Sequence, residues 1–419
     1  MASKKHQLFA QPAYRRLMAG QTASTLGSSV STFALFIYTF DTTRSASLAA
    51  IVSSLSVIAT LLVSVPAGAW IDRINPLSAI FASVWCGIIT TTAAVCLHYL
   101  FGVIPVGFLC LISFLLGCAT ALFAPAERAA LKRMIAPELL GSAMAINQAR
   151  YSIGTVGGPL VGAIMYARDK AAPFGFDLLT YIFAAWMFRS IPQSQLHYAG
   201  ESGPKKADSY LDTITWIKSD PLLWTVVWFT PVLNFAMSGS LNSMHVVLAQ
   251  NPAGSTQLGW FQSSYGLCGL LGSLIATVII TRFRGGVILC CCAVVFAVVF
   301  LTAPWITGWL LATGVFGCFA IALPCFNAVL SGYFVIKVPH HFVGKATAIM
   351  VVTAMGFMPI GMWVSGILIE SCSPMVAFYS FASVFSLAAV AFLATPAVRS
   401  LPVLREIPSA TSASMEDQN

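Results

Sequence analysis

Residues 47–73 read SLAAIVSSLSVIATLLVSVPAGAWIDR, and this stretch decides the fold class. No charged residue occurs between Ser47 and Ile71, and the run ends in the charged pair Asp72 and Arg73. A helix that crosses the hydrocarbon core of a bilayer needs about 20 consecutive, mostly apolar residues. The stretch therefore predicts a membrane-spanning helix that is followed by a short charged loop.

The composition of the chain extends this prediction to the whole protein. Hydrophobic residues make up 58% of the 419 positions and charged residues only 9%, and the mean hydropathy is +0.84. Soluble domains carry about 25% charged residues, so we exclude a soluble fold. The 11 cysteines show no metal-ligand spacing, and we interpret them as small packing residues. The formal charge of +8 comes without clustered basic and aromatic residues, so we expect no nucleic-acid partner.

About twelve apolar segments of spanning length are separated by short polar breaks. We expect the first to be retained as a helix rather than cleaved as a signal peptide, because no small-residue cleavage site follows it. The predicted spans are 18–40, 47–70, 77–99, 104–126, 141–166, 173–191, 222–248, 257–281, 285–303, 307–334, 345–369 and 374–396.

Lys and Arg residues are distributed unevenly over these breaks, and cytoplasmic loops carry the excess of positive charge. One side of the membrane receives only Arg44, Arg168 and Lys170. The other side receives Lys4, Lys5, Arg15, Arg16, Arg73, Arg128, Lys132, Arg133, Lys205, Lys206, Arg282, Arg284, Lys337, Arg399 and Arg405. We therefore expect a multi-pass protein of the inner (cytoplasmic) cell membrane with both termini in the cytoplasm.

The longest polar stretch, 192–220, divides the predicted spans into six and six. We expect an N-terminal six-helix bundle (1–191), a cytoplasmic linker (192–220), a C-terminal six-helix bundle (221–396) and a cytoplasmic tail (397–419). Residues 137–146 resemble residues 339–349, and each copy lies between the fourth and fifth span of its half. Duplicated halves are typical of secondary transporters. The predicted fold is an all-α membrane protein whose halves are related by a pseudo-two-fold axis.

The loop after the second span gives a specific resemblance. Gly68-Ala-Trp-Ile-Asp72-Arg73 resembles the Gly-x-x-x-Asp-Arg signature of the major facilitator superfamily, at the position where that family carries it. The resemblance implies that Asp72 faces the start of the eleventh span, near Gly344 and Lys345, and helps to close the cytoplasmic side. Asn75-Pro76-Leu77 replaces the basic end of the full motif, so a weaker latch is expected.

The fifth span contains a second motif, Gly154-Thr-Val-Gly-Gly158-Pro159-Leu-Val-Gly162. It resembles the Gly-x-x-x-Gly-Pro-x-x-Gly pattern of antiporters and exporters in the same superfamily. The glycines lie four residues apart, so they share one helix face with Arg150 and permit close helix contact. Gly266, Gly269 and Gly272 on the eighth span are the expected complementary surface. Tight packing without any directional meaning is the alternative interpretation.

Three further segments narrow the resemblance to the macrolide and siderophore exporter branch, which includes drug:proton antiporters. They are Tyr14–Ser28, Phe123-Ala-Pro-Ala-Glu-Arg128 and Asp177-Leu-Leu-Thr-Tyr181. All three lie in the N-terminal half, whereas the C-terminal half matches mainly by its succession of spans.

Charged residues within or beside the spans are candidates for gating. Arg150 lies a few turns into the fifth span, where a charge requires a partner or a wet cavity. The alternative is that its side chain reaches the cytoplasmic surface. Glu127 and Arg128 follow the fourth span, and we predict that they join Arg73 in a cytoplasmic charge network.

Polar stripes on the first and seventh spans are candidates for the substrate cavity, because the resemblance implies that these spans line it. The predicted cavity residues are Gln21, Ser24, Ser28, Ser31, Asn234, Ser238, Asn242 and Phe326. Interhelical hydrogen bonding is the alternative explanation for both stripes.

Proton coupling requires a titratable group that is exposed alternately to the two sides. The candidates are Asp177, His245 and Glu370, with Asp177 preferred. Coupling to another ion or to substrate charge stays open. We expect a proton gradient as the energy source and no cofactor or metal.

The sequence therefore predicts a monomeric secondary transporter that exports a small amphipathic molecule, such as a drug or siderophore-like metabolite. Import of a nutrient on the same fold is the alternative. An intramembrane enzyme would need paired carboxylates, a metal cluster or a Ser/His constellation within the bilayer, and the sequence offers none of these.

Overall fold

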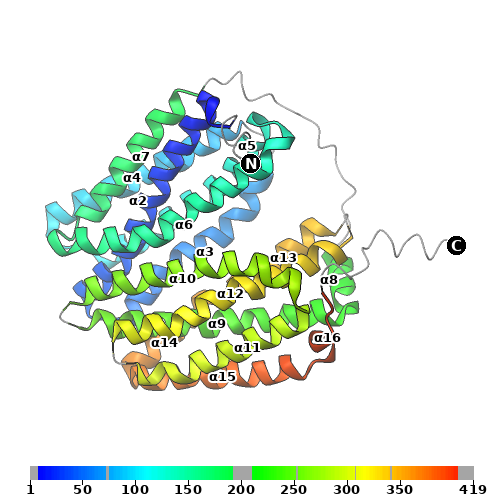
Figure 1. The fold of residues 1–419 in the computed structure, drawn as a ribbon. Helices are drawn as coiled ribbons and strands as arrows, with labels where there is room; N and C mark the ends of the chain where they lie inside the picture. Colours follow the sequence, from blue (N-terminus) through cyan, green and yellow to red (C-terminus); the bar gives the residue numbers. More distant parts are fainter. Residues whose placement is uncertain are drawn as a thin grey trace. The chain divides into compact units, whose positions relative to one another are not determined.

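The fold was analysed in a computed structural model that describes residues 8–71, 75–191, 210–251, 253–306, 308–339 and 342–403. These residues form helices joined by short connections, and no strand occurs among them (Figure 1). The long helices are α2 (Pro12–Thr43), α3 (Ala46–Ile71), α4 (Pro76–Phe101), α5 (Val106–Met134), α6 (Pro137–Arg168), α7 (Ala172–Arg189), α9 (Pro221–Ala249), α10 (Gly254–Arg282), α11 (Gly285–Thr302), α12 (Trp309–Lys337) and α15 (Pro374–Ala394). The shorter ones are α8 (Tyr210–Ser219), the 3₁₀ turn η2 (Ala303–Trp305), α13 (Val343–Gly356), α14 (Met358–Ser371) and α16 (Pro396–Arg399).

Prolines and polar caps set several of these helix boundaries. Pro12, Pro76, Pro137 and Pro374 stand in the first turn of their helices, where a missing backbone N–H costs nothing. The side chain of Asn75 accepts the N–H of Leu77 at 3.0 Å and so caps α4. The eleventh predicted span is divided into α13 and α14 at Phe357, because Pro359 cannot continue the hydrogen-bond ladder.

Each of the twelve predicted spans coincides with one of these helices or, for residues 345–369, with the pair α13 and α14. Nine segments of the described chain are long and apolar enough to cross a membrane. Helices α2, α6 and α7 are not among the nine. Helix α2 carries the polar stripe of the first predicted span, α6 carries Arg150, and α7 carries Asp177. These polar residues lower the mean hydropathy of the three helices. The count of twelve spans therefore stays a prediction, whereas the all-helical membrane fold is confirmed.

The chain divides into two compact units. The first comprises Met1–Glu201 and Val246–Ser263, and the second comprises Ser202–His245 and Ser264–Asn419. Of the predicted linker, residues 192–209 lie outside the described residues, and α8 occupies most of the remainder. Of the predicted tail, the described part ends at Val403.

In the first unit, α2 packs along both α6 and α7 (Figure 1). A side chain on Gly20 would meet Phe188 and Ala184 of α7. A side chain on Gly158 of α6 would clash with Ser29 of α2. Helix α2 is thus held between two neighbours at distances that only small residues allow.

The second unit has an aromatic core. Phe229 of α9 stacks on Phe392 of α15 with ring centroids 4.1 Å apart. Phe296 of α11 and Phe326 of α12 lie 5.7 Å apart in the same cluster. Large rings that pack edge to face stabilise helix contacts where lipid provides no hydrophobic driving force.

We predict that Gly158→Ala destabilises the first unit, because the added methyl group has no space beside Ser29. Gly175→Ala in α7 is the matched control, because nothing lies within 4 Å of the position that its Cβ would take. Because this substitution creates no clash, the higher helix propensity of alanine, worth about 1 kcal/mol in water, should stabilise α7. Thermal unfolding of the purified protein should show a lower midpoint for Gly158→Ala and an unchanged or higher one for Gly175→Ala. Equal unfolding midpoints for the two variants would contradict the close contact between Gly158 and Ser29.

Candidate functional site

Gly68 belongs to α3, whereas Asp72 and Arg73 lie outside the described residues. Lys345, near the start of α13, is described. The latch between Asp72 and the eleventh span stays a prediction.

Arg150 of α6 is buried in a polar site between α2, α5 and α6, with 7% of its surface exposed. Its Nη2 atom lies 2.9 Å from Oε1 and 3.2 Å from Oε2 of Glu127, which is 4% exposed. Its Nε atom donates to Asn147 at 2.8 Å, and its Nη1 atom donates to the Gln21 carbonyl at 3.1 Å and to the Thr25 hydroxyl. The expectation that Arg150 requires a partner is met by Glu127, and its side chain is not a surface group.

The predicted cytoplasmic network of Glu127 and Arg128 with Arg73 stays a prediction. Glu127 was expected to pair with Arg73, which lies outside the described residues, but the partner that the structure shows is Arg150. Arg128, next to Glu127, is exposed. The hydroxyl of Tyr14 and the side-chain amide of Gln21 are buried without a hydrogen-bond partner among the described residues. Buried groups of this kind are usual sites for ordered water.

The glycine face of α6 packs on α2. Cβ atoms built on Gly154 and Gly162 would lie 2.8 Å from Thr25 and 2.9 Å from Phe33. Pro159, on the same helix, presents its carbonyl to Gly259 of α10, whose Cβ would lie 3.0 Å from it. The motif residues therefore create close contacts within the first unit.

The expected complementary surface on the eighth span is wrong for Gly269 and Gly272. A Cβ built on Gly272 would clash with the backbone of Ile321, and one built on Gly269 would lie 3.8 Å from the carbonyl of Ala320, so both face α12. Helical periodicity identifies a small face but not the helix that packs on it.

The polar stripe of α2 is mostly buried. Gln21, Ser24 and Ser31 are buried, and Ser28 lies 3.0 Å from the hydroxyl of Tyr181 on α7. In this conformation the stripe contributes to packing and hydrogen bonding with α7, which is the alternative left open by the sequence. Its role as a cavity wall stays a prediction.

Asp177 lies inside the first unit at the contact of α2 and α7. Its side chain is fully buried, and a Cβ built on Gly27 of α2 would lie 2.5 Å from its Oδ1 atom. Thr180 donates to Oδ1 at 3.3 Å, whereas Oδ2 has no hydrogen-bond partner among the described residues. The hydroxyl of Ser31 on α2 is buried beside this carboxyl. An ionisable side chain buried in a membrane protein is by default a candidate functional residue.

Asp169, in the turn between α6 and α7, has contrasting surroundings. The backbone N–H of Ala171 donates to its Oδ1 atom at 2.6 Å, and the hydroxyl of Tyr99 donates to Oδ2 at 2.9 Å. The hydrogen bond from Ala171 is the main cause that lowers the pKa of Asp169 below its usual value. Asp169 is therefore ionised at neutral pH. It provides a control position for substitutions of Asp177.

The polar stripe of α9 faces α14 in part. Asn242 donates to Ser365 at 3.2 Å, and Ser238 donates to the Met358 carbonyl at 2.9 Å. Asn234 donates to the Thr230 carbonyl of its own helix at 3.0 Å. Ser238 and Asn242 thus join two helices, as the alternative interpretation expected.

The remaining candidates, Phe326, His245 and Glu370, belong to the second unit. Phe326 is 1% exposed and belongs to the aromatic core, so its ring faces other phenylalanines in this conformation. Glu370 is exposed near the end of α14, and His245 is half-buried on α9. A role of His245 or Glu370 in proton coupling stays a prediction.

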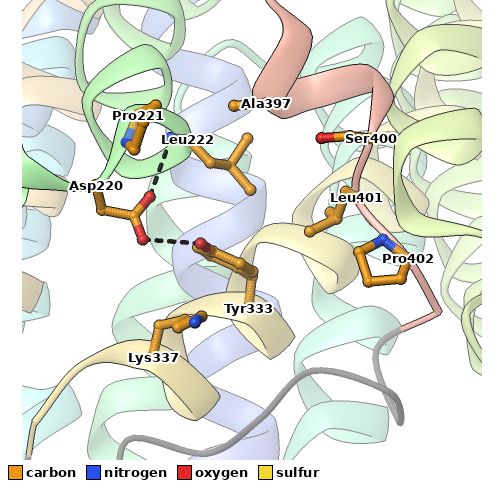
Figure 2. Close-up of a pocket in the computed structure, with 9 residues that line it drawn as sticks. All are labelled: Asp220, Pro221, Leu222, Tyr333, Lys337, Ala397, Ser400, Leu401 and Pro402. Atoms are coloured by element: carbon orange, nitrogen blue, oxygen red, sulfur yellow. Dashed lines mark hydrogen bonds between the residues drawn. The ribbon is translucent and has the colours of Figure 1, made fainter. Parts of the chain in front are cut away.

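The sequence analysis missed two hollows in the second unit. One, with a volume of about 260 Å³, is bounded by the start of α9, the end of α12 and the C-terminal segment (Figure 2). Asp220 accepts the N–H groups of Leu222 and Leu223 and the hydroxyl of Tyr333, and so caps α9 there. The other, of about 410 Å³, lies between α10 and α12. Its signal was the spacing of four residues between Ser273 and Thr277 and between Asn327 and Ser331.

Comparison with known proteins identifies the family. The family model of the Major Facilitator Superfamily matches residues 17–334. The chain belongs to this superfamily, and the protein is a secondary transporter rather than an enzyme. No curated protein matches the chain in sequence.

Solved transporter structures share the fold. The nucleoside transporter NupG superposes with a TM-score of 0.72 at 16% identity, over 91% of this chain and 98% of that one. A bacterial homologue of the iron transporter ferroportin in the inward-facing state gives 0.71 at 16%, over 90% and 97%. A POT family transporter in complex with 5-aminolevulinic acid gives 0.71 at 13%, over 91% and 96%. Identities this low establish the fold alone.

We predict that Glu127→Leu lowers stability by about 3–5 kcal/mol, because it leaves the Arg150 guanidinium buried without its counter-charge. The double variant Glu127→Leu/Arg150→Met should regain much of the loss, since both charges are then absent. Arg128→Ala, which removes the adjacent exposed charge, is the control. Thermal unfolding in detergent ranks the variants. A double variant less stable than Glu127→Leu would contradict the interpretation that Glu127 acts as the counter-charge of Arg150.

Proposed function

We propose that this transporter exports a small amphipathic molecule in exchange for protons, and that Asp177 carries the proton. The observation that carries the proposal is the burial of Asp177 between α2 and α7 with one oxygen unpartnered among the described residues. A small movement of α2 relative to α7 changes the surroundings of this carboxyl, because Gly27 allows the two helices to meet at its Oδ1 atom. Proton uptake and helix movement are thereby linked in one contact.

The glycine motif of α6 supports export. Gly154, Gly158 and Gly162 set the distance between α6 and α2, the same helix that covers Asp177. The resemblance of this motif to exporters favours efflux, and the resemblance of the N-terminal half to the macrolide and siderophore exporters favours a drug or siderophore-like substrate. The two halves then expose the binding site alternately in a rocker-switch cycle.

The charge distribution supports a location in the inner cell membrane with both termini in the cytoplasm. We include in the proposal that the protein works as a monomer. The buried ion pair of Glu127 and Arg150 is complete within one chain, so no second copy is required to neutralise it.

Direction is tested in vesicles with a radiolabelled compound selected by its stabilisation of the purified protein in a thermal-shift screen. Energised inside-out vesicles should accumulate the compound, since their interior corresponds to the outside of the cell. Accumulation only in right-side-out vesicles would establish an importer and overturn the proposal.

We predict that Asp177→Asn abolishes flux driven by an imposed pH gradient. Exchange of labelled for unlabelled compound, measured without a gradient, should stay unchanged. Amide replacement keeps the shape of the side chain and removes its titration. Asp169→Asn is the matched control and should retain gradient-driven flux, because Asp169 stays ionised in the outer turn. Gradient-driven flux that is unchanged in Asp177→Asn would assign the coupled proton to another group.

A further inference from the structure

The groove between α10 and α12 opens next to a close contact of the two helices. A side chain on Gly272 of α10 would clash with the backbone of Ile321 on α12, and the thiol of Cys325 lies 3.8 Å from the Gly272 carbonyl. From this contact towards the ends of the two helices at Arg282 and Lys337, the residues that follow line a hollow of about 410 Å³. Its volume is within the range of small-molecule sites, about 300–1,000 Å³.

The lining of the groove combines four polar residues with four apolar ones and carries no charge. Ser273 and Thr277 come from α10, and Asn327 and Ser331 come from α12. These four side chains are exposed although both helices are apolar enough to span the membrane. An exposed amide in hydrocarbon is costly, so this face is suited to water or to a polar ligand rather than to lipid.

The hydrogen-bonding directions of the two walls differ. Ser273 donates to the Gly269 carbonyl at 3.0 Å, and Thr277 donates to the Leu274 carbonyl at 2.7 Å. Their protons are therefore committed to the helix backbone, and their oxygens are left as acceptors. Asn327 and Ser331 make no side-chain hydrogen bond with any described residue, so the α12 wall offers both donors and acceptors.

Apolar groups complete the groove. Pro324 and Ile280 lie beside the polar residues and provide an apolar surface of limited size. The combination fits a ligand with one hydroxyl-rich edge and one apolar edge. A carboxylate or an ammonium group would find no counter-charge among the residues that line the groove.

We propose that this groove binds the uncharged, polyhydroxylated part of an amphipathic substrate. Hydroxyl groups of the ligand donate to Ser273 and Thr277 and exchange hydrogen bonds with Asn327, while its apolar part packs on Pro324. This inference rests on the proposed transport function and names the substrate class for it.

The test is equilibrium binding of two probes to the purified protein in lipid nanodiscs without any ion gradient. Phenyl β-D-glucoside is neutral, and phenyl β-D-glucuronide differs from it by a carboxylate in place of one hydroxymethyl group. The neutral probe should bind, and the anionic probe should bind at least about tenfold more weakly. Wild-type protein that binds no glucoside at millimolar concentration, or binds both probes equally, would overturn the proposal.

Two variants locate the binding. Asn327→Ala and the isosteric Thr277→Val should each weaken glucoside binding by about tenfold, the usual effect of one or two lost hydrogen bonds. Ser383→Ala on α15 removes an equally exposed hydroxyl of the same unit and should bind as wild type. If Asn327→Ala fails to fold, Thr277→Val decides, and binding unchanged in every folded groove variant would overturn the assignment.

This assay separates the two proposals. Binding without a gradient depends neither on Asp177 nor on the direction of transport. If the protein binds the glucoside through Asn327 but shows no proton-driven export, the proposed binding site stands and the proposed coupling to protons fails.

Discussion

The arrangement of the first unit depends on how closely α2 approaches α6 and α7. Glycines on both sides of these contacts, such as Gly27 and Gly158, bring backbones together where ordinary side chains would separate them. Only at this separation does the Arg150 guanidinium reach the carbonyl of Gln21, and only there is Asp177 enclosed by α2. In a bilayer, where no water reaches the backbone, this packing also decides which polar groups have partners.

Apolar length predicted the helices well, because each span must bury its backbone in hydrocarbon and needs a fixed number of residues to do so. The partners of polar residues were harder to predict. Glu127 and Arg150 are 23 residues apart on different helices, and nothing in the sequence distinguishes Arg150 from Arg73 as the partner of Glu127. The groove residues were missed because a serine and a threonine four positions apart are ordinary in membrane helices, where their hydroxyls bond to their own backbone.

Charge is divided unequally between the two units. The buried charged side chains of the described chain, Glu127, Arg150 and Asp177, all belong to the first unit. The buried polar residues of the second unit, such as Asn242 and Ser365, are neutral. Under the two proposals made above, the tasks are divided in the same way: the first unit carries the proton, and the second unit recognises the substrate through uncharged hydrogen-bonding groups.

The C-terminal segment bears on how the chain is assembled. Leu401 and Pro402 accept the N–H groups of Gly286 and Gly285 at 3.1 Å and 3.0 Å, which satisfies backbone donors at the start of α11. Leu401 and Pro402 follow α11 in the chain, so the ribosome synthesises them after this helix. Until these two residues are present, the first backbone donors of α11 must bond to water or lipid headgroups, so this end of the helix reaches its final hydrogen bonding only after Leu401 and Pro402 have been synthesised.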